Sequence, residues 1–133
     1  AATFVDIAGG KIPGGLHGRS FLPILRGETP ADWRKSIYYH YYDGGHSVAK
    51  HYGVRTDRYT LANFYESNEW ELFDREKDPQ ELKSVYADPA YAKTVAELKT
   101  ELSRLRAQYQ DSDDIKPAAR GPNQNPNGKK KKS

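Results

Sequence analysis

The spacing of hydrophobic residues changes along the chain, and each change predicts a different element. In residues 1–9, AATFVDIAG, the side chains of Phe4, Ile7 and Ala8 share one face at helical spacing, and the glycines that follow are a typical helix stop. A helix this short is not stable by itself in water, so we expect it to need a packing partner from outside this chain.

A loop and a second short helix are expected next. Residues 10–19 are rich in Gly and Pro, which is typical of a loop. The segment FLPILRG then predicts a short helix, with Ser20 as its N-cap and Gly27 as its stop. A connector that carries Trp33 leads on to the next element.

From residue 36 onward the period changes to two, which is typical of β-strands. The first predicted strand is SIYYHYY, residues 36–42. Its two faces are lined by Ile37, Tyr39 and Tyr41 and by Tyr38, His40 and Tyr42. Three further strands are predicted at 50–56, 58–65 and 69–74. The links between these strands are short, which favours an antiparallel sheet.

The last periodic segment predicts one long amphipathic helix. Its apolar side chains alternate between spacings of four and three: Tyr91, Val95, Leu98, Leu102, Leu105 and Tyr109. Asp88-Pro89 is a typical helix start, and Asp78-Pro79 is the same signal before a short helix or turn. The single stripe favours packing on one face of the sheet, with a coiled-coil seam as the alternative. The predicted fold class is α+β, a four-stranded antiparallel sheet packed against one long C-terminal helix.

The net charge of +3 comes from the end of the chain. Residues 111–133 are rich in Asp, Pro, Asn, Gly and Lys, so we expect a disordered basic tail. This tail holds six of the 21 basic and three of the 18 acidic side chains, which leaves fifteen of each sign in residues 1–110. The balance argues against a basic groove on the folded part and against a nucleic-acid partner. The run Lys129–Lys132 would contact phosphate or only solubilise the tail.

Composition excludes several kinds of site. The chain has no cysteine, which excludes disulfides, thiolate metal sites and a cysteine nucleophile. It has no apolar run long enough for a transmembrane helix, so no membrane partner is expected. With 133 residues it forms one domain at most. Because it starts at Ala1, in the middle of an apolar pattern, we expect it to be truncated.

Four motifs follow one another along the chain in a recognisable order. They are TFVDIAGG with GRSFLPILRG near the start, GVRT at residues 53–56, RYTL at 58–61, and ELFDREKDPQE at 71–81. In this order they resemble the C-terminal subdomain of the sulfatase family, which includes the arylsulfatases and the N-sulphoglucosamine sulphohydrolases. The resemblance covers residues 3–110. One departure, Thr60 in place of the usual Lys, lies at a position that we interpret as structural.

The resemblance implies a division of the chain. Residues 1–27 would be a remnant of the preceding catalytic domain, residues 28–110 the C-terminal subdomain, and residues 111–133 the disordered Lys-rich tail. The implied partner is the missing catalytic domain. The substrate of the whole protein would be a sulfated carbohydrate or an aryl sulfate, and its location periplasmic or secreted.

The resemblance also implies which chemistry is missing. Family members use a formylglycine nucleophile, made from Cys or Ser in a C/S-x-P/A-x-R motif, and a calcium site in the N-terminal domain. The segment that starts at Ser20 does not match, because Pro23 and Arg26 are out of register. We therefore expect no catalytic residue, metal ligand or cofactor in this chain, which alone would be inactive.

Three side chains remain as candidates for substrate contact. His46 and His51 flank the loop after the first strand, and Arg55 lies on the second. Hydrogen-bonding and cationic side chains there would contact a sulfated sugar in the pocket of such a sulfatase. Two alternatives stay open: the histidines are also typical of a polar surface, and Arg55 would equally form a structural ion pair or a domain contact.

Other features carry less information about function. His40, His46 and His51 have no acidic ligand at suitable spacing, which argues against a metal site. Trp33 and Trp70 would either stack on a sugar ring or pack in the fold. The hypotheses that compete with a sulfatase domain are a stand-alone carbohydrate-binding or interaction module and a nucleic-acid-binding protein.

Overall fold

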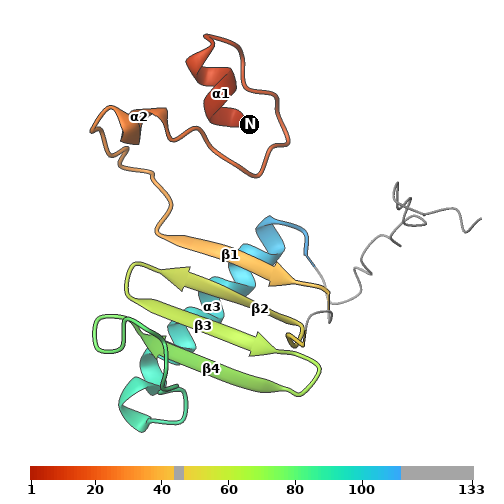
Figure 1. Ribbon diagram of the computed structural model, residues 1–133, viewed down its shortest axis with the longest axis vertical. Helices are drawn as coiled ribbons and strands as arrows, with labels where there is room; N and C mark the ends of the chain where they lie inside the picture. The colour runs from red at the N-terminus through yellow and green to blue at the C-terminus, as the bar shows by residue number, and fades with distance from the viewer. Residues whose placement is uncertain (44–46, 112–133) are drawn as a thin grey trace, which may run out of the picture.

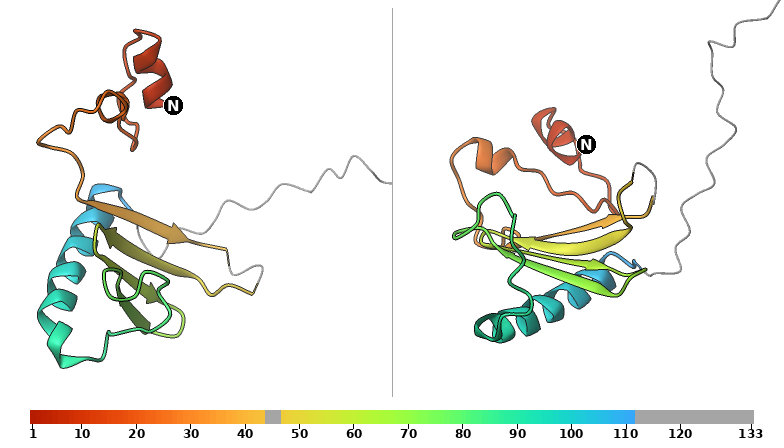
Figure 2. Two further views of the ribbon diagram at one scale, coloured as in Figure 1. Left: turned by 60° about the vertical axis from the view of Figure 1, so that its left-hand side comes forward. Right: turned by 60° about the horizontal axis from the view of Figure 1, so that its bottom comes forward.

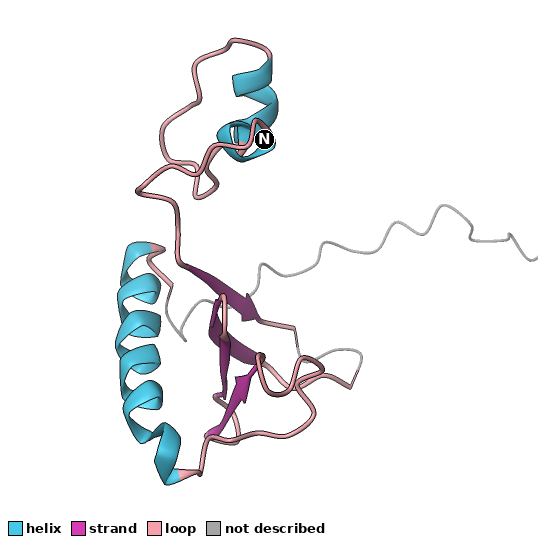
Figure 3. Ribbon diagram, turned by 90° about the vertical axis from the view of Figure 1, so that its left-hand side faces the viewer, coloured by secondary structure: helices cyan, strands magenta, loops and turns pink. Residues whose placement is uncertain are grey.

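A four-stranded antiparallel sheet and one long helix form two layers (Figure 1). The computed structural model describes residues 1–43 and 47–111. The strands β1 (Ser36–Tyr41), β2 (His51–Thr56), β3 (Tyr59–Phe64) and β4 (Glu69–Asp74) lie in the sheet in sequence order. Helix α3 (Ala92–Gln108) follows a 3-10 turn, η1 (Pro89–Tyr91), and covers one face of the sheet (Figure 3). The predicted α+β fold is confirmed.

Local sequence signals set most of the element ends. All four strands agree with the predicted ones to within one residue at either end. The Asp88 side chain caps the last helical segment by accepting a hydrogen bond from the Ala90 amide at 2.9 Å. Asp78-Pro79 opens a turn instead of a helix. There the Asp78 carboxylate accepts from the Lys83 amide at 2.8 Å, and Glu81 has a φ of 56°.

The apolar stripe of α3 packs on the centre of the sheet. Val54, Leu61 and Leu72 form a row across three strands, because Leu61 is the register partner of both others. All three are fully buried. Their core cluster also contains Tyr52 and, from α3 and the turn before it, Leu98, Leu102, Leu105 and Tyr91. The stripe is therefore a sheet-packing face and not a coiled-coil seam.

A partly buried ion pair joins the start of β3 to the end of β4. Arg58 donates from Nε and Nη2 to the Asp74 carboxylate, at 2.9 and 2.7 Å. The Tyr91 hydroxyl donates to the same carboxylate at 3.0 Å. The hydrogen bond from Arg58 is the main reason that the pKa of Asp74 falls to about 2. Arg58 and Asp74 both belong to the sequence motifs, so these motif residues hold the fold together.

The two short helices near the start of the chain form a small substructure. Helices α1 (Ala2–Ile7) and α2 (Leu22–Leu25) lie beside each other beyond β1, outside the two layers (Figure 2). Ser20 is not the N-cap that the sequence predicted, because α2 begins one residue later, with Phe21 as its N-cap and no side-chain cap. The Ser20 hydroxyl accepts from the Leu22 amide at 3.2 Å and donates to Asp6 at 2.5 Å.

The apolar side chains of this substructure face solvent. Phe4 is 77% exposed and Leu25 is 62% exposed, although both lie on helices. The helices end as predicted, with Gly9 at φ 70° and Gly27 at φ 81°, conformations that glycine adopts without steric cost. Two short helices with solvent-exposed Phe and Leu match the expectation that this segment needs a packing partner.

Candidate functional site

The face of the sheet opposite α3 carries His51 within a cluster of aromatic rings. The imidazole stacks on Tyr41, with ring centres 5.6 Å apart. It also lies 5.9 Å from the ring of Tyr39 and 5.3 Å from that of Phe64. His51 Nδ1 is 2.8 Å from the Ala49 carbonyl oxygen. Since a carbonyl only accepts, Nδ1 carries the proton, and Nε2 is the nitrogen that can meet a ligand.

Tyr39 lies across β2 between His51 and Arg55. Its cross-strand partner is Gly53. A Cβ atom at Gly53 would lie 2.4 Å from the Tyr39 hydroxyl oxygen and 2.3 Å from the Leu61 carbonyl oxygen, so only glycine leaves room for this ring. Burial raises the pKa of Tyr39 to about 12, which keeps its hydroxyl protonated at neutral pH. In the sequence, nothing but its strand position marked Tyr39.

Arg55 lies on the same face and forms an ion pair. Its Nη1 is 3.6 Å from Oε1 of Glu81, and Nε of Arg75 is 3.4 Å from the same oxygen. The Thr60 hydroxyl donates to that oxygen at 2.8 Å. The Arg55 side chain nevertheless remains 46% exposed. Arg55 therefore has the structural ion pair that the sequence left open, and it still presents surface to a ligand.

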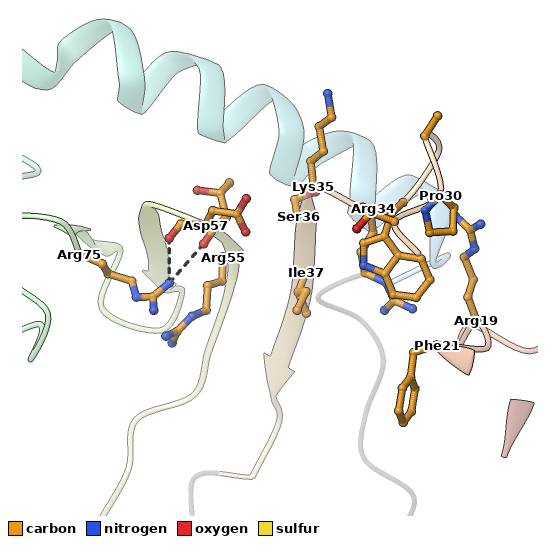
Figure 4. A pocket seen from close by; sticks show the side chains of 14 residues that line it. Arg19, Phe21, Pro30, Arg34, Lys35, Ser36, Ile37, Arg55, Asp57 and Arg75 are labelled. Carbon is orange, nitrogen blue, oxygen red and sulfur yellow. Dashed lines mark hydrogen bonds between the residues drawn. The ribbon is translucent and has the colours of Figure 1, made fainter. Parts of the chain in front are cut away.

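Arg55 also lines a groove of about 840 Å³ between the sheet and the chain that leads into β1 (Figure 4). Five basic side chains line this cationic groove: Arg19, Arg34, Lys35, Arg55 and Arg75. The guanidinium groups of Arg19 and Arg34 each lie 5.3 Å from the ring centre of Trp33. The charge balance of residues 1–110 argued against a basic groove. That expectation was wrong, because folding gathers cations that are far apart in the sequence.

Of the other two histidine candidates, His46 lies outside the described residues, and His40 does not join the His51 face. His40 is buried on the face covered by α3, where its ring stacks on Tyr42 with centres 3.7 Å apart. Within residues 1–43 and 47–111, no group of three or more His, Asp or Glu side chains could hold a metal ion.

His40 instead belongs to a polar cluster around Asp111, the first residue of the expected tail. The Asp111 carboxylate is 2.6 Å from His40 Nδ1 and accepts from the Tyr42 hydroxyl at 2.6 Å and from the Tyr38 hydroxyl. Burial raises the pKa of Asp111, but these hydrogen bonds together outweigh it, so the pKa lies below its ordinary value. The cluster joins the end of α3 to β1.

The two tryptophans have different surroundings. Trp70 is partly buried against the core, parallel to the ring of Tyr86 at 6.1 Å, and Lys99 Nζ lies 4.2 Å from its ring centre. Trp70 therefore has a packing role. Trp33 lines the cationic groove, where it supports the two arginines.

The family membership follows from comparison with known proteins. Residues 1–108 match the family model described as "N-sulphoglucosamine sulphohydrolase, C-terminal". The chain belongs to this sulfatase family. This sulfatase C-terminal domain is 44% identical over 118 residues to an N-acetylglucosamine-6-O-sulfatase of Bacteroides thetaiotaomicron. The match covers 85% of the chain and 21% of the relative, so the chain spans about a fifth of the relative's length.

Solved structures place the domain in the same group. A protein determined in complex with its substrate D-glucosamine-2-N,6-O-disulfate superposes with a TM-score of 0.80 and 43% identity, over 84% of this chain and 24% of that chain. A 2-O GAG sulfatase superposes with a TM-score of 0.74 and 32% identity, over 82% of this chain and 24% of that chain. The predicted resemblance is thereby confirmed: this chain corresponds to the C-terminal domain of sulfatases.

Several residues of the sequence motifs form ion pairs in this sulfatase domain. The motif residues Arg58 and Asp74 form the ion pair that joins β3 to β4. The motif residues Arg55 and Glu81 form a second ion pair, on the face opposite α3. The hydroxyl of Ser20, the nearest candidate for a nucleophile, is hydrogen-bonded to Asp6 and to the Leu22 amide. None of the helices in the described part of the chain is long and apolar enough to cross a membrane.

Proposed function

We propose that the chain is the C-terminal domain of a carbohydrate sulfatase, and that the sheet face opposite α3 forms part of the substrate pocket. The observation that carries this proposal is the position of His51. Its ring packs against Tyr41, Tyr39 and Phe64, and Nδ1 is engaged by the Ala49 carbonyl, so Nε2 would be the nitrogen that meets a ligand. The role of His46 in the same pocket stays a prediction.

A sulfated amino sugar is the proposed substrate class. The N-acetylglucosamine-6-O-sulfatase relative and the structural relative bound to D-glucosamine-2-N,6-O-disulfate support it. His51 would donate to or accept from the sugar, and Arg55, four residues further along β2, would pair with an anionic group elsewhere on the substrate. The formylglycine nucleophile and the calcium ion, as in sulfatases generally, would lie in the catalytic domain of the whole protein and supply the attack on sulfur.

The proposed partner of this chain is that catalytic domain, with residues 1–27 as part of its fold. The exposed apolar side chains of α1 and α2 support this assignment, since Phe4, Ile7 and Leu25 would be buried by such a partner. A surface of this kind favours one domain of a larger protein over a stand-alone carbohydrate-binding module. The same assignment predicts that the chain by itself does not hydrolyse an aryl sulfate.

A chimeric enzyme tests the proposed function. Residues 1–111 would replace the matching C-terminal part of the N-acetylglucosamine-6-O-sulfatase relative, and hydrolysis of N-acetylglucosamine-6-sulfate would be followed. We expect an active chimera in which His51→Ala lowers kcat/KM roughly tenfold to a hundredfold, the range for one hydrogen bond to a charged or polar partner. The matched control is Lys93→Ala, since the Lys93 side chain on α3 is 89% exposed.

Two outcomes would contradict the proposal. A soluble, folded chimera with no activity would argue that this domain does not complete a sulfatase pocket of that specificity. An active chimera that tolerates His51→Ala as well as it tolerates Lys93→Ala would remove His51 from the pocket.

A further inference from the structure

The cationic groove keeps a surplus of positive charge after its internal ion pairs are counted. Arg19 pairs with Asp32 at 2.9 Å, and Arg55 and Arg75 share Glu81. Asp57 adds one more carboxylate to the lining. Five basic side chains thus face three carboxylates. Among the described residues, Arg34 and Lys35 form no ion pair with any of these carboxylates.

The groove and His51 are separated along β2. His51 and Arg55 share one face of β2 and are four residues apart, which corresponds to about 14 Å along a strand. The ring of Tyr39 crosses the strand between them, over Gly53. A single pyranose ring is much shorter than this separation. A sugar held at His51 therefore leaves the groove open for a different part of the same chain of sugars.

We propose that the cationic groove is a second anion-binding site, which takes the sulfate or carboxylate groups of neighbouring sugars in a sulfated oligosaccharide. This inference rests on the proposed function, since Arg55 belongs both to the groove and to the face that carries His51. Arginine suits this ligand because its planar guanidinium donates two parallel hydrogen bonds to an oxyanion. A polyanionic oligosaccharide would then occupy both the His51 face and the groove, whereas an isolated sulfated sugar would occupy only the His51 face.

Binding to the full chain tests the groove directly. The probe is a fully sulfated heparin-type tetrasaccharide, titrated calorimetrically at two salt concentrations. The double variant Arg34→Gln/Lys35→Gln removes the two cations that pair with none of the three carboxylates, so it leaves the internal pairs of the groove in place. We expect it to weaken binding about threefold to tenfold, because two partly exposed ion contacts are lost. Lys93→Gln, on the far side of α3, is the matched control and leaves the affinity unchanged.

Two further arms identify the source of the binding. Replacement of Lys129–Lys132 by glutamine removes four positive charges from the tail, and the dependence on Arg34 and Lys35 should persist in that background. A single-stranded oligonucleotide of equal charge should bind more weakly than the tetrasaccharide. The inference is overturned if the double variant binds like the wild type, if the tail accounts for all the binding, or if the oligonucleotide binds as tightly.

Kinetics in the chimera separate this inference from the proposed function. Arg34→Gln/Lys35→Gln should raise KM for a sulfated tetrasaccharide and leave turnover of the sulfated monosaccharide unchanged, whereas His51→Ala should affect both. If His51→Ala lowers activity and the double variant leaves KM for the tetrasaccharide unchanged, only the groove proposal is overturned. If the double variant raises that KM and His51→Ala has no effect, the pocket assignment of His51 is contradicted and the groove proposal stands.

Discussion

The two faces of the sheet differ in what their side chains do. On the face covered by α3, Val54, Leu61 and Leu72 are fully buried, and the Asp74 carboxylate is held by Arg58 and Tyr91. On the opposite face, His51 sits among aromatic rings, Ile37 is 53% exposed, and arginines gather at one end. One face therefore stabilises the domain, and the other is available to a substrate or to the rest of a sulfatase.

This difference is sharpest between two aliphatic residues. Leu61→Ala should lower the free energy of unfolding by about 2–5 kcal/mol, because it opens a cavity where the side chain is fully buried. Ile37→Ala, on the open face, should cost less than about 1 kcal/mol. Urea unfolding followed by circular dichroism measures both. Equal costs for the two variants would mean that the open face is packed in solution.

Gly53 is a place on the open face where a small change should be costly. Gly53→Ala should destabilise the domain by about 1–3 kcal/mol, because the new methyl group meets the Tyr39 ring and the Leu61 carbonyl. Gly14→Ala is the control, since no atom lies within 4 Å of its added Cβ. Adding Gly53→Ala to a Tyr39→Ala variant should still destabilise it, because the carbonyl remains. Full tolerance in that background would assign the whole effect to the ring.

The ion pair of Asp74, on the face covered by α3, predicts that the stability of the domain depends on pH. The pKa of Asp74 is about 2 in the folded state, below its ordinary value, so the unfolded chain binds this proton more readily. The stabilisation is present above about pH 4 and disappears as the pH falls towards 2, at a cost on the order of 1–2 kcal/mol. Urea unfolding between pH 2 and 6 should show this loss of stability. Asp74→Asn should remove the part of the pH dependence that comes from Asp74. Glu97→Gln, on the exposed surface of α3, should keep the full dependence.

The smallest effect on stability is expected for the exposed apolar side chains of α1 and α2. Phe4→Ser with Leu25→Ser should change the unfolding free energy of the two-layer unit by less than about 0.5 kcal/mol, because both side chains already face water. The same pair of substitutions should weaken the chimeric sulfatase and reduce binding of a hydrophobic dye to the isolated chain. A large loss of stability in the isolated chain would show that α1 and α2 pack on the sheet.

Much of the fold could be predicted because its signals are local. Alternation from Ser36 to Tyr41 assigned the two faces of β1, and the spacing from Tyr91 to Tyr109 predicted the helix that covers the sheet. The cap at Asp88 and the stops at Gly9 and Gly27 also act within a few residues. Only part of the candidate site could be predicted from the sequence, which pointed to His51 and Arg55 but not to Tyr39.

What the sequence determined by itself is the alternation of faces, the order of elements and membership of the sulfatase family, because periodicity and short motifs are properties of neighbouring residues. Only the tertiary structure decided which distant residues meet. The groove takes side chains from Arg19, Arg34, Lys35, Arg55 and Arg75, and the Asp111 cluster joins the end of α3 to β1. Such contacts depend on strand register and on the path of connecting loops. A charge balance summed along the chain therefore could not reveal that five cations share one groove.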